Sequence, residues 1–219
     1  MQIQIDNTLL NDPAKNVEYD QYLLENAKKS ELVLRLWEPQ QCYVVLGKSN
    51  RADQEVHVDR CYQDQIPIIK RCSGGGTVLN DKGMLNFAIV GPQQQPFKSI
   101  HQCNVGMSTY IKNALQSKNI PLEIKGTSDI TFMGKKCVGN AQKRTLNFYL
   151  FHGCILFDTD ISKISYYLKH PSKEPAYRQK KSHKDFLCNI SYSKAELIMF
   201  LKNAITSIHN AYKQESNFK

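Results

Sequence analysis

The chain has 219 residues, of which 41% are hydrophobic and 22% are charged, a composition typical of a soluble globular protein with one sizeable core. Its 29 Lys and Arg residues outnumber 20 Asp and Glu residues, and the net charge of +9 favours acidic partners such as nucleotides or an acidic protein domain. The basic residues are spread out rather than gathered into a tract interleaved with aromatic residues, which argues against a nucleic-acid partner.

The cysteines and the N-terminal sequence indicate the cellular compartment in which the protein is expected. Seven cysteines, an odd number with no Cys-x-x-Cys pair, argue against a disulfide framework and against a zinc site. Reduced thiols fit a cytoplasmic setting. The N-terminus lacks the basic region and apolar core of a signal peptide, and no stretch is long and apolar enough to span a membrane. We therefore expect a cytoplasmic protein with no membrane partner.

In chain order, an irregular or strand-like lead-in precedes an amphipathic helix predicted over 17–28. Apolar, β-branched runs predict strands at 31–37 and 42–46, and the Pro-Gln-Gln turn at 39–41 predicts that the two strands form a hairpin. Asp53 is expected to cap the next helix. The elements expected from there to residue 90 are a helix at 55–63 and strands at 66–69, 77–79 and 85–90.

The clearest internal helix covers 99–118. Its apolar face is expected to carry Val105, Met107, Ile111, Ala114 and Leu115. The basic stretch 169–184 contains two prolines and predicts a long loop. The other elements expected are strands at 122–124, 129–132, 136–138 and 150–157, and helices at 161–168 and 196–212. Antiparallel-looking strands with helices between them indicate an α+β fold, and without a low-complexity linker we expect a single domain over 1–219.

Residues 70–78 read Lys-Arg-Cys-Ser-Gly-Gly-Gly-Thr-Val, a glycine run that follows two cations. Glycine allows the backbone to adopt positive φ or to approach a ligand closely, and bare N–H groups beside cations form an anion cradle. A flexible hairpin loop is the structural alternative. A second stretch of cations and glycines, at 134–142, suggests that both hold one anionic ligand. Neither stretch matches the Walker or the Rossmann phosphate motif.

Lys136 is the residue best suited to chemistry, because a lysine fixed at a strand start can hold a phosphoryl or carbonyl oxygen as negative charge develops. A solvated surface lysine is the alternative, and Lys135 is the control, since strand neighbours face opposite ways. His152 is either an acid, base or hydrogen-bond donor, or a satisfied core residue. Asp81 and Asp129 are candidates for a metal ion bound with a nucleotide, although Asp81 also suits a turn.

Three blocks, in order along the chain, carry a family resemblance. Leu-Trp at 36–37 and Val-Val-Leu-Gly-Lys-Ser-Asn at 44–50 are similar to two strands of the family. The stretch 70–86 is similar to its Arg-Arg-x-Ser-Gly-Gly-Gly-x-Val-x-His-Asp-x-Gly-Asn-x-Asn. The stretch 129–153 is similar to its Gly-Lys-Lys-x-x-Gly-x-Ala-Gln block and the His-Gly strand that follows. Together the blocks resemble the lipoate-protein ligase A family, within the larger group of biotin and lipoate protein ligases and octanoyltransferases.

The resemblance implies a mixed or antiparallel central β-sheet flanked by helices, like the catalytic domains of biotin and lipoate ligases and of class II aminoacyl-tRNA synthetases. It also implies an ATP-dependent ligase. Lipoate, or octanoate, and Mg-ATP would give the acyl-AMP and pyrophosphate, and a lysine of an acceptor lipoyl domain would then attack the mixed anhydride. Lys136 matches the lysine that holds the acyl carbonyl and the phosphate, and Asp129 is the candidate ligand for Mg²⁺ bound with ATP.

The same matching identifies the residues expected to bind the lipoyl group and the adenylate. They are Arg71, Ser73, Gly74, Gly75, Gly76, Thr77, Val78, Leu79, Asn80, Asp81, Asn86, Asp129, Gly139, Asn140, Ala141, His152 and Gly153. The chain departs from the family pattern at Lys70, Asn80, Met84 and Ser128, which replace Arg, His, Asn and Asn. Longer ligases carry a C-terminal accessory domain, which this chain is expected to lack, so a separate accessory subunit is an expected partner.

Two other functions stay open. An octanoyltransferase would move octanoyl from acyl carrier protein through a cysteine acyl-enzyme, or the chain would transfer a preformed acyl group without its own adenylation. The segments where the resemblance places that cysteine, 121–123 and 170–172, contain none, which leaves Cys154 and Cys137, the latter expected to pack inertly. A non-catalytic binder of lipoyl domains is the second alternative. The 169–184 loop is either a solvated connection or an adenylate-binding or acceptor-docking loop.

Overall fold

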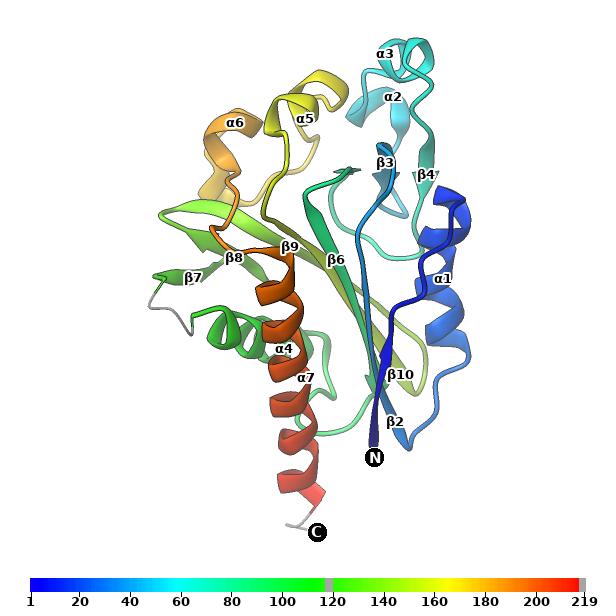
Figure 1. The fold of residues 1–219 in the computed structure, drawn as a ribbon, viewed down its shortest axis with the longest axis vertical. Coiled ribbons are helices and arrows are strands. Elements are labelled where there is room, and N and C mark those ends of the chain that lie inside the picture. Colours follow the sequence, from blue (N-terminus) through cyan, green and yellow to red (C-terminus); the bar gives the residue numbers. More distant parts are fainter. Residues whose placement is uncertain (117–119, 217–219) are drawn as a thin grey trace.

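In the computed structural model, which describes residues 1–116 and 120–216, the strands form two sheets with helices around them (Figure 1). The larger sheet has seven strands in the order β1-β2-β6-β10-β9-β8-β7, and the smaller sheet has the order β4-β3-β5. β1 runs parallel to β2 and β4 runs parallel to β3, while the other neighbouring pairs are antiparallel. The strands are β1 (Gln2–Asp6), β2 (Glu31–Trp37), β3 (Tyr43–Leu46), β4 (Ile68–Lys70), β5 (Val78–Asn80), β6 (Met84–Pro92), β7 (Leu122–Lys125), β8 (Asp129–Phe132), β9 (Lys135–Arg144) and β10 (Phe148–Leu156).

Helices cover both faces of the larger sheet, so the mixed α+β architecture is confirmed. The helices are α1 (Pro13–Glu25), α2 (Ala52–Glu55), α3 (Val58–Gln63), α4 (Ile100–Leu115), α5 (Ile161–Tyr167), α6 (His183–Phe186) and α7 (Lys194–Ser216), with a short 3-10 helix at Ala176–Arg178. α4 and α7 lie together on one face and α1 lies on the other (Figure 1). None of the helices within residues 1–116 and 120–216 combines the length and the apolar character needed to cross a bilayer.

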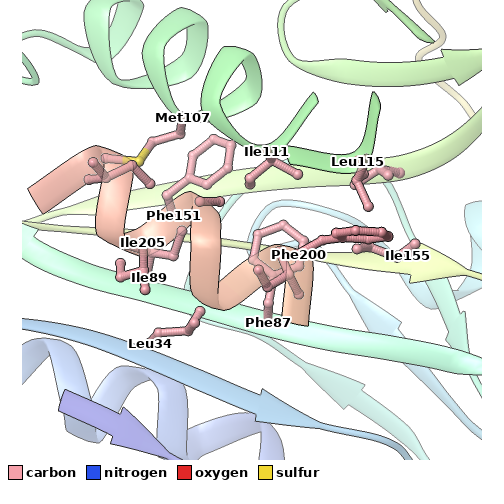
Figure 2. Packing of buried hydrophobic residues seen from close by; sticks show 14 of the residues in the cluster. Leu34, Phe87, Ile89, Met107, Ile111, Leu115, Phe151, Ile155, Phe200 and Ile205 are labelled. Atoms are coloured by element: carbon pink, nitrogen blue, oxygen red, sulfur yellow. The ribbon is translucent and has the colours of Figure 1, made fainter. Parts of the chain in front are cut away.

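Side chains alternate between the two faces of the central strands, and this alternation separates the core from the α1 side. On β2, Leu34 points into the main core beneath α4 and α7, whereas Val33 packs with α1. On β10, Phe151 joins the same main core, which Figure 2 shows from close by. Arg35 and His152, the next residues along these strands, are hydrogen-bonded to Asp20 on α1.

Capping residues determine where helices α1 and α4 begin. Asp12 accepts hydrogen bonds from two backbone N–H groups of the first turn of α1, and Pro13 occupies the first position, where its lack of an N–H carries no penalty. α1 therefore begins and ends earlier than the predicted 17–28. α4 begins after Ser99, whose side chain and that of Gln102 form a reciprocal capping box.

The hairpin predicted from the strands at 31–37 and 42–46 is wrong. β2 pairs with β1 and β6 in the larger sheet, whereas β3 pairs with β4 and β5 in the smaller one. The connection through 39–41 therefore moves the chain from one sheet to the other. Strand propensity marks each strand correctly but carries no information about distant pairing partners.

Two predictions about helix residues are also wrong. Asp53 does not cap a helix; it lies in the first turn of α2 and pairs with Arg51 at 2.8 Å. Val105 is 44% exposed, because it lies on the opposite side of α4 from the fully buried Met107. Cys103 and Ser108 occupy the buried face instead.

The predicted loop at 169–184 contains a 3-10 helix and the start of α6. Arg178 is buried there; its Nε donates to Lys181 O at 3.1 Å and its guanidinium lies 4.6 Å from the centre of the Phe186 ring. The buried Arg178 therefore organises this segment from within, so the segment is not the fully solvated connection that the sequence left open as one alternative.

Ile111→Ala should lower the free energy of unfolding by about 2–5 kcal/mol, because Ile111 is fully buried between α4 and the sheet (Figure 2). Val105→Ala, on the same helix but exposed, is the matched control and should change it by less than about 0.5 kcal/mol. Urea unfolding measures both as midpoint shifts at constant slope. Equal losses in the two variants would contradict the assigned faces of α4.

Candidate functional site

Two adjoining pockets lie beside the glycine-rich loop at 70–78. The inner pocket has a volume of about 140 Å³ and is lined by Asp20 of α1 and Trp37 of β2 among others. The outer pocket has a volume of about 480 Å³ and is lined by Asp129 and Arg178 among others. The residues that line both pockets are Gly76, Thr77, Val78, Lys136, Gly139, Asn140, Ala141 and Cys154.

Strand register explains one wall of the inner pocket. Trp37 on β2 is opposite Asn86 on β6, Asn86 is opposite Cys154 on β10, and Cys154 is opposite Gly139 on β9. Neighbouring strands lie about 4.8 Å apart, so this row of four residues is about 14 Å long. The pocket can therefore accommodate an extended, chain-like ligand lying across the strands.

Three buried polar atoms of the inner pocket have no hydrogen-bond partner within the part of the chain that the structure describes. They are Trp37 Nε1, Asn86 Nδ2 and Asn140 Oδ1. Leaving such a group unpaired costs about 1–3 kcal/mol, and folded proteins normally pair it with protein, water or ligand. Two of the atoms donate and one accepts, so the pocket offers hydrogen bonds to a polar group of a bound molecule.

Lys136 stands at the junction of the two pockets, with its Nζ 2.7 Å from Asp129 Oδ1. Tyr177 donates to the other oxygen of that carboxylate at 2.7 Å. Gly139 leaves room for the lysine, because a Cβ there would lie 2.7 Å from Lys136 Cε. Lys135 is exposed and bonds to a carbonyl of α6, so the two lysines face different surroundings as predicted.

Arg71 fixes the shape of the glycine loop. Its Nη2 donates to Gly74 O at 2.6 Å and to Gly76 O at 2.8 Å. Gly75 lies between these carbonyls at a φ of +90°, and a Cβ there would lie 2.9 Å from the guanidinium, so the position requires glycine. Burial lowers the pKa of Arg71 to about 10, which leaves it a cation at neutral pH. A buried cation thus holds the loop that the sequence also allowed to be a flexible hairpin.

His152 has a partner on each ring nitrogen. Its Nδ1 lies 2.8 Å from Asp20 Oδ2 and its Nε2 lies 2.7 Å from Ser73 Oγ. Asp20 also forms an ion pair with Arg35, at 2.7 Å, and Arg35 is fully buried. His152 is therefore a satisfied buried histidine that also lines the inner pocket.

The two cysteines left open by the sequence differ in position. Cys154 lines both pockets, but burial raises the pKa of its thiol, so it is protonated at neutral pH and is a poor nucleophile. Cys137 is fully buried and its thiol donates to Ile130 O at 3.4 Å, which is the inert packing that the sequence predicts.

Most of the predicted binding residues line the pockets, and Ser73 and Asp81 lie outside the two linings. Asp81 accepts from the Lys82 N–H and from Lys163 Nζ, the latter at 2.7 Å, which is the turn role that the sequence also allowed. Those in the inner pocket are Arg71, Gly76, Thr77, Val78, Asn80, Asn86, Gly139, Asn140, Ala141, His152 and Gly153. The outer pocket adds Gly74, Gly75, Leu79 and Asp129.

Sequence reasoning missed Asp20 and Glu55. Asp20 lies on a helix that read only as amphipathic, and Arg35 within an apolar strand was the available signal, since a buried charge needs a partner. Glu55 is buried at the end of α2 and accepts from the Ser172 N–H at 3.2 Å. That bond fastens the 169–184 segment, which forms part of the outer pocket wall, to α2.

The residues that the structure describes do not form a dedicated metal site. Within the described ranges, no group of three or more His, Cys, Asp or Glu side chains is placed to hold a metal ion. Both oxygens of Asp129 are engaged, by Lys136 and Tyr177. Magnesium commonly binds to one or two carboxylates together with water and substrate phosphates. A role for Asp129 beside Mg²⁺ therefore stays a prediction, and the ion would enter as part of the substrate Mg-ATP.

The family model described as the lipoyl protein ligase A/B catalytic domain matches residues 12–203, so the chain belongs to this family. Lipoate-protein ligase A of Blochmanniella floridana is 31% identical over 167 residues, 74% of this chain and 48% of that protein. Lipoate-protein ligase LplJ of Bacillus subtilis is 29% identical over 187 residues, 85% of this chain and 55% of that protein. The chain thus spans about half the length of the curated relatives it matches.

Solved structures share the fold. A bi-partite lipoate protein ligase of Thermoplasma acidophilum has a TM-score of 0.83 at 22% identity, covering 94% of this chain and 83% of that one. A lipoate-protein ligase A bound with ATP has a TM-score of 0.78 at 23% identity, covering 95% of this chain and 86% of that one. The expected lipoate-ligase fold is confirmed, while the likeness to class II aminoacyl-tRNA synthetases stays a prediction.

Tyr177→Phe should loosen the 169–184 segment from β8 and lower the free energy of unfolding by about 0.5–1.5 kcal/mol, because it removes the bond to Asp129. Burial and the neighbouring carboxylate raise the pKa of Tyr177 above its usual value of 10. The hydrogen bond from the neutral phenol to Asp129 therefore stabilises the fold fully below pH 10. This stabilisation is lost as the pH rises through the raised pKa of Tyr177.

Urea unfolding at neutral pH and above pH 10 tests this expectation. The difference between wild type and Tyr177→Phe should shrink at the higher pH. Tyr166→Phe, at a residue that is 44% exposed, is the matched control and should change stability by less than about 0.5 kcal/mol. A difference that stays constant with pH would contradict a buried, neutral Tyr177 as the donor.

Proposed function

We propose that the protein is an ATP-dependent lipoate-protein ligase. It activates lipoate, or octanoate, with Mg-ATP to an acyl-AMP and passes the acyl group to a lysine of an acceptor lipoyl domain. Membership of the lipoyl protein ligase A/B family and relatives named as lipoate-protein ligases support this reaction.

The proposal rests on the position of Lys136 between two pockets of different character. Val17, Trp37 and Val45, which form one hydrophobic cluster, give the inner pocket apolar walls that suit an acyl chain. The outer pocket is larger, and Lys169 and Arg178 give it cations that suit phosphate groups. An acid whose chain fills the inner pocket presents its carboxylate beside Lys136, where the α-phosphate of a nucleotide in the outer pocket also lies.

Two displacements make up the reaction. A carboxylate oxygen attacks the α-phosphorus, and the bond to pyrophosphate breaks. The neutral amine of the acceptor lysine then attacks the acyl carbonyl, the bond to AMP breaks, and the amine loses a proton as the amide forms. Negative charge grows on oxygens near Lys136 in both steps, and the ammonium group of Lys136 stabilises it. Asp129 holds that ammonium group in place. The chain contributes placement and charge stabilisation, because AMP is a good leaving group.

Comparable proteins support the substrates and partners in this proposal. One structure of this fold is described with ATP, and the Thermoplasma acidophilum ligase is described as bi-partite and with its E2 lipoyl domain. We therefore include ATP, an acceptor lipoyl domain and a separate accessory subunit. The net charge of +9 suits an acidic acceptor, and seven free cysteines suit the cytoplasm.

The 169–184 segment serves, in this proposal, as the wall that holds the adenylate. Lys173, Arg178 and His183 line the outer pocket from this segment. Bonds from Tyr177 to Asp129 and from Ser172 to Glu55 fasten it on two sides. A segment fastened at these two points adds cations to the pocket with little further loss of conformational entropy on binding.

Lys136→Ala should reduce acyl-AMP formation by at least about 100-fold, because the variant lacks the cation at the reacting oxygens. Lys135→Ala is the matched control and should keep a rate near that of wild type, since its amine bonds outside the pockets. The assay supplies lipoate and Mg-ATP, measures pyrophosphate release, and then measures the mass gain of an isolated acceptor domain. Addition of synthetic lipoyl-AMP tests the transfer step alone.

The two alternatives give different results in the same assay. An octanoyltransferase would transfer octanoyl from acyl carrier protein without ATP and would lose activity in Cys154→Ser, the variant of the cysteine that lines both pockets. A non-catalytic binder would retain ligand affinity in Lys136→Ala and modify no acceptor with either donor. Either pattern would replace the ligase proposal.

A further inference from the structure

A line of buried hydrogen bonds runs from β2 to the glycine loop. Arg35 pairs with Asp20 at 2.7 Å, and Asp20 lies 2.8 Å from His152 Nδ1. His152 Nε2 lies 2.7 Å from Ser73 Oγ, which accepts from Arg71 Nε at 2.9 Å. Arg71 in turn bonds to two carbonyls of the glycine loop. The line therefore joins a central strand, a helix and a second strand to the loop.

All five members are buried. Arg35 is 0%, Ser73 1%, Asp20 6%, His152 8% and Arg71 9% exposed. Water therefore has little access to replace a missing member, and a broken bond leaves a polar group unpaired. Buried networks of this kind strengthen along their length and hold one arrangement of side chains.

The chemistry of the members fixes the direction of the bonds. A carboxylate only accepts and a guanidinium only donates, so Asp20 accepts from His152 Nδ1–H and Ser73 Oγ accepts from Arg71 Nε–H. In the tautomer that carries its proton on Nδ1, His152 Nε2 accepts a hydrogen bond from the Ser73 hydroxyl. With the imidazole proton on Nδ1, each bond of the line joins one donor to one acceptor.

Ser73, His152 and Asp20 are spaced like a nucleophile, a base and an orienting acid. Ser73 lies outside both pocket linings and is 1% exposed, so its oxygen has no access to a substrate carbonyl. Arg71 also donates to that oxygen and draws electron density from it. The Asp20–His152–Ser73 geometry, which activates the serine in a hydrolase, therefore serves in this protein to hold the Arg71 side chain.

We propose that Asp20, His152 and Ser73 are positioning residues that hold the Arg71 guanidinium beneath the glycine loop and so keep the loop closed around the anionic part of its ligand. The identity of that ligand rests on the proposed function, whereas the positioning itself does not. The line makes the loop depend on α1 and β10, which lie far from it in sequence.

Nuclear magnetic resonance of the 219-residue chain tests the proposal without substrate. The probes are the Arg71 Nε proton and the backbone amides of Lys48 and Arg71, which donate to Ser73 O at 2.8 Å and to Leu46 O at 3.0 Å. Ser73→Ala should speed their exchange with solvent by about tenfold, the effect of losing one buried hydrogen bond. Amides of the β6–β10 ladder should keep their wild-type rates.

His152→Gln should have the same local effect. His209→Gln is the matched control, because His209 on α7 is equally buried at 8% exposed and bonds through Nε2 to Met1 O at 2.7 Å, away from the glycine loop. The control should leave exchange at the loop unchanged. Asp20→Asn adds a spectroscopic signature: the new amide faces His152 Nδ1 as a donor, so the imidazole proton should move to Nε2, visible in the ring nitrogen shifts.

Wild-type exchange at the loop in Ser73→Ala and His152→Gln would overturn the proposal. A uniform rise across the whole sheet would also overturn it, since that marks general destabilisation. An acyl adduct on Ser73, detected by mass, would replace positioning with nucleophilic catalysis. Because the exchange experiment needs no substrate, a protein that fails to make acyl-AMP but shows the local effect would reject the proposed ligase and keep the positioning role.

Discussion

The buried charge of Arg35 is the constraint on which the arrangement of the site depends. A guanidinium that is 0% exposed on a central strand must be fully paired, and removing one partner of such a pair typically costs about 3–5 kcal/mol. Asp20 and the carbonyls of Asn16 and Thr8 supply the partners, the last two at 2.9 and 3.0 Å. All three lie on or just before α1, so pairing Arg35 also sets α1 on the sheet and forms one wall of the inner pocket.

The central strands carry two different surfaces because successive side chains point to opposite faces. One face of β2, β6 and β10 supplies Leu34, Phe87 and Phe151 to the core beneath α4 and α7. The α1 side holds Arg35 and His152, whose polar groups are satisfied by hydrogen bonds. A well-packed core on one face thus provides the rigid support on which the polar site of the other face is built.

Local features of the chain were predictable from sequence and non-local ones were not. The strand at 31–37, the helix α4 and the different environments of Lys135 and Lys136 follow from periodicity over a few residues. The last two residues of the helix predicted at 99–118 lie outside the described residues. The false hairpin shows where that information ends, because the partners of β2 are set by packing across the sheet. Asp20 was missed for the same reason: its role appears only when α1 meets β2 and β10.

Trp37 is the single tryptophan of the chain, and it lines the inner pocket with its indole nitrogen unpaired within the described residues. Indole emission responds to the polarity and hydrogen bonding of its surroundings. All tryptophan fluorescence of the native protein therefore comes from Trp37, at one wall of the inner pocket. A molecule that enters this pocket and contacts the indole changes the intrinsic tryptophan fluorescence. Binding is therefore measurable without a label and without a reaction.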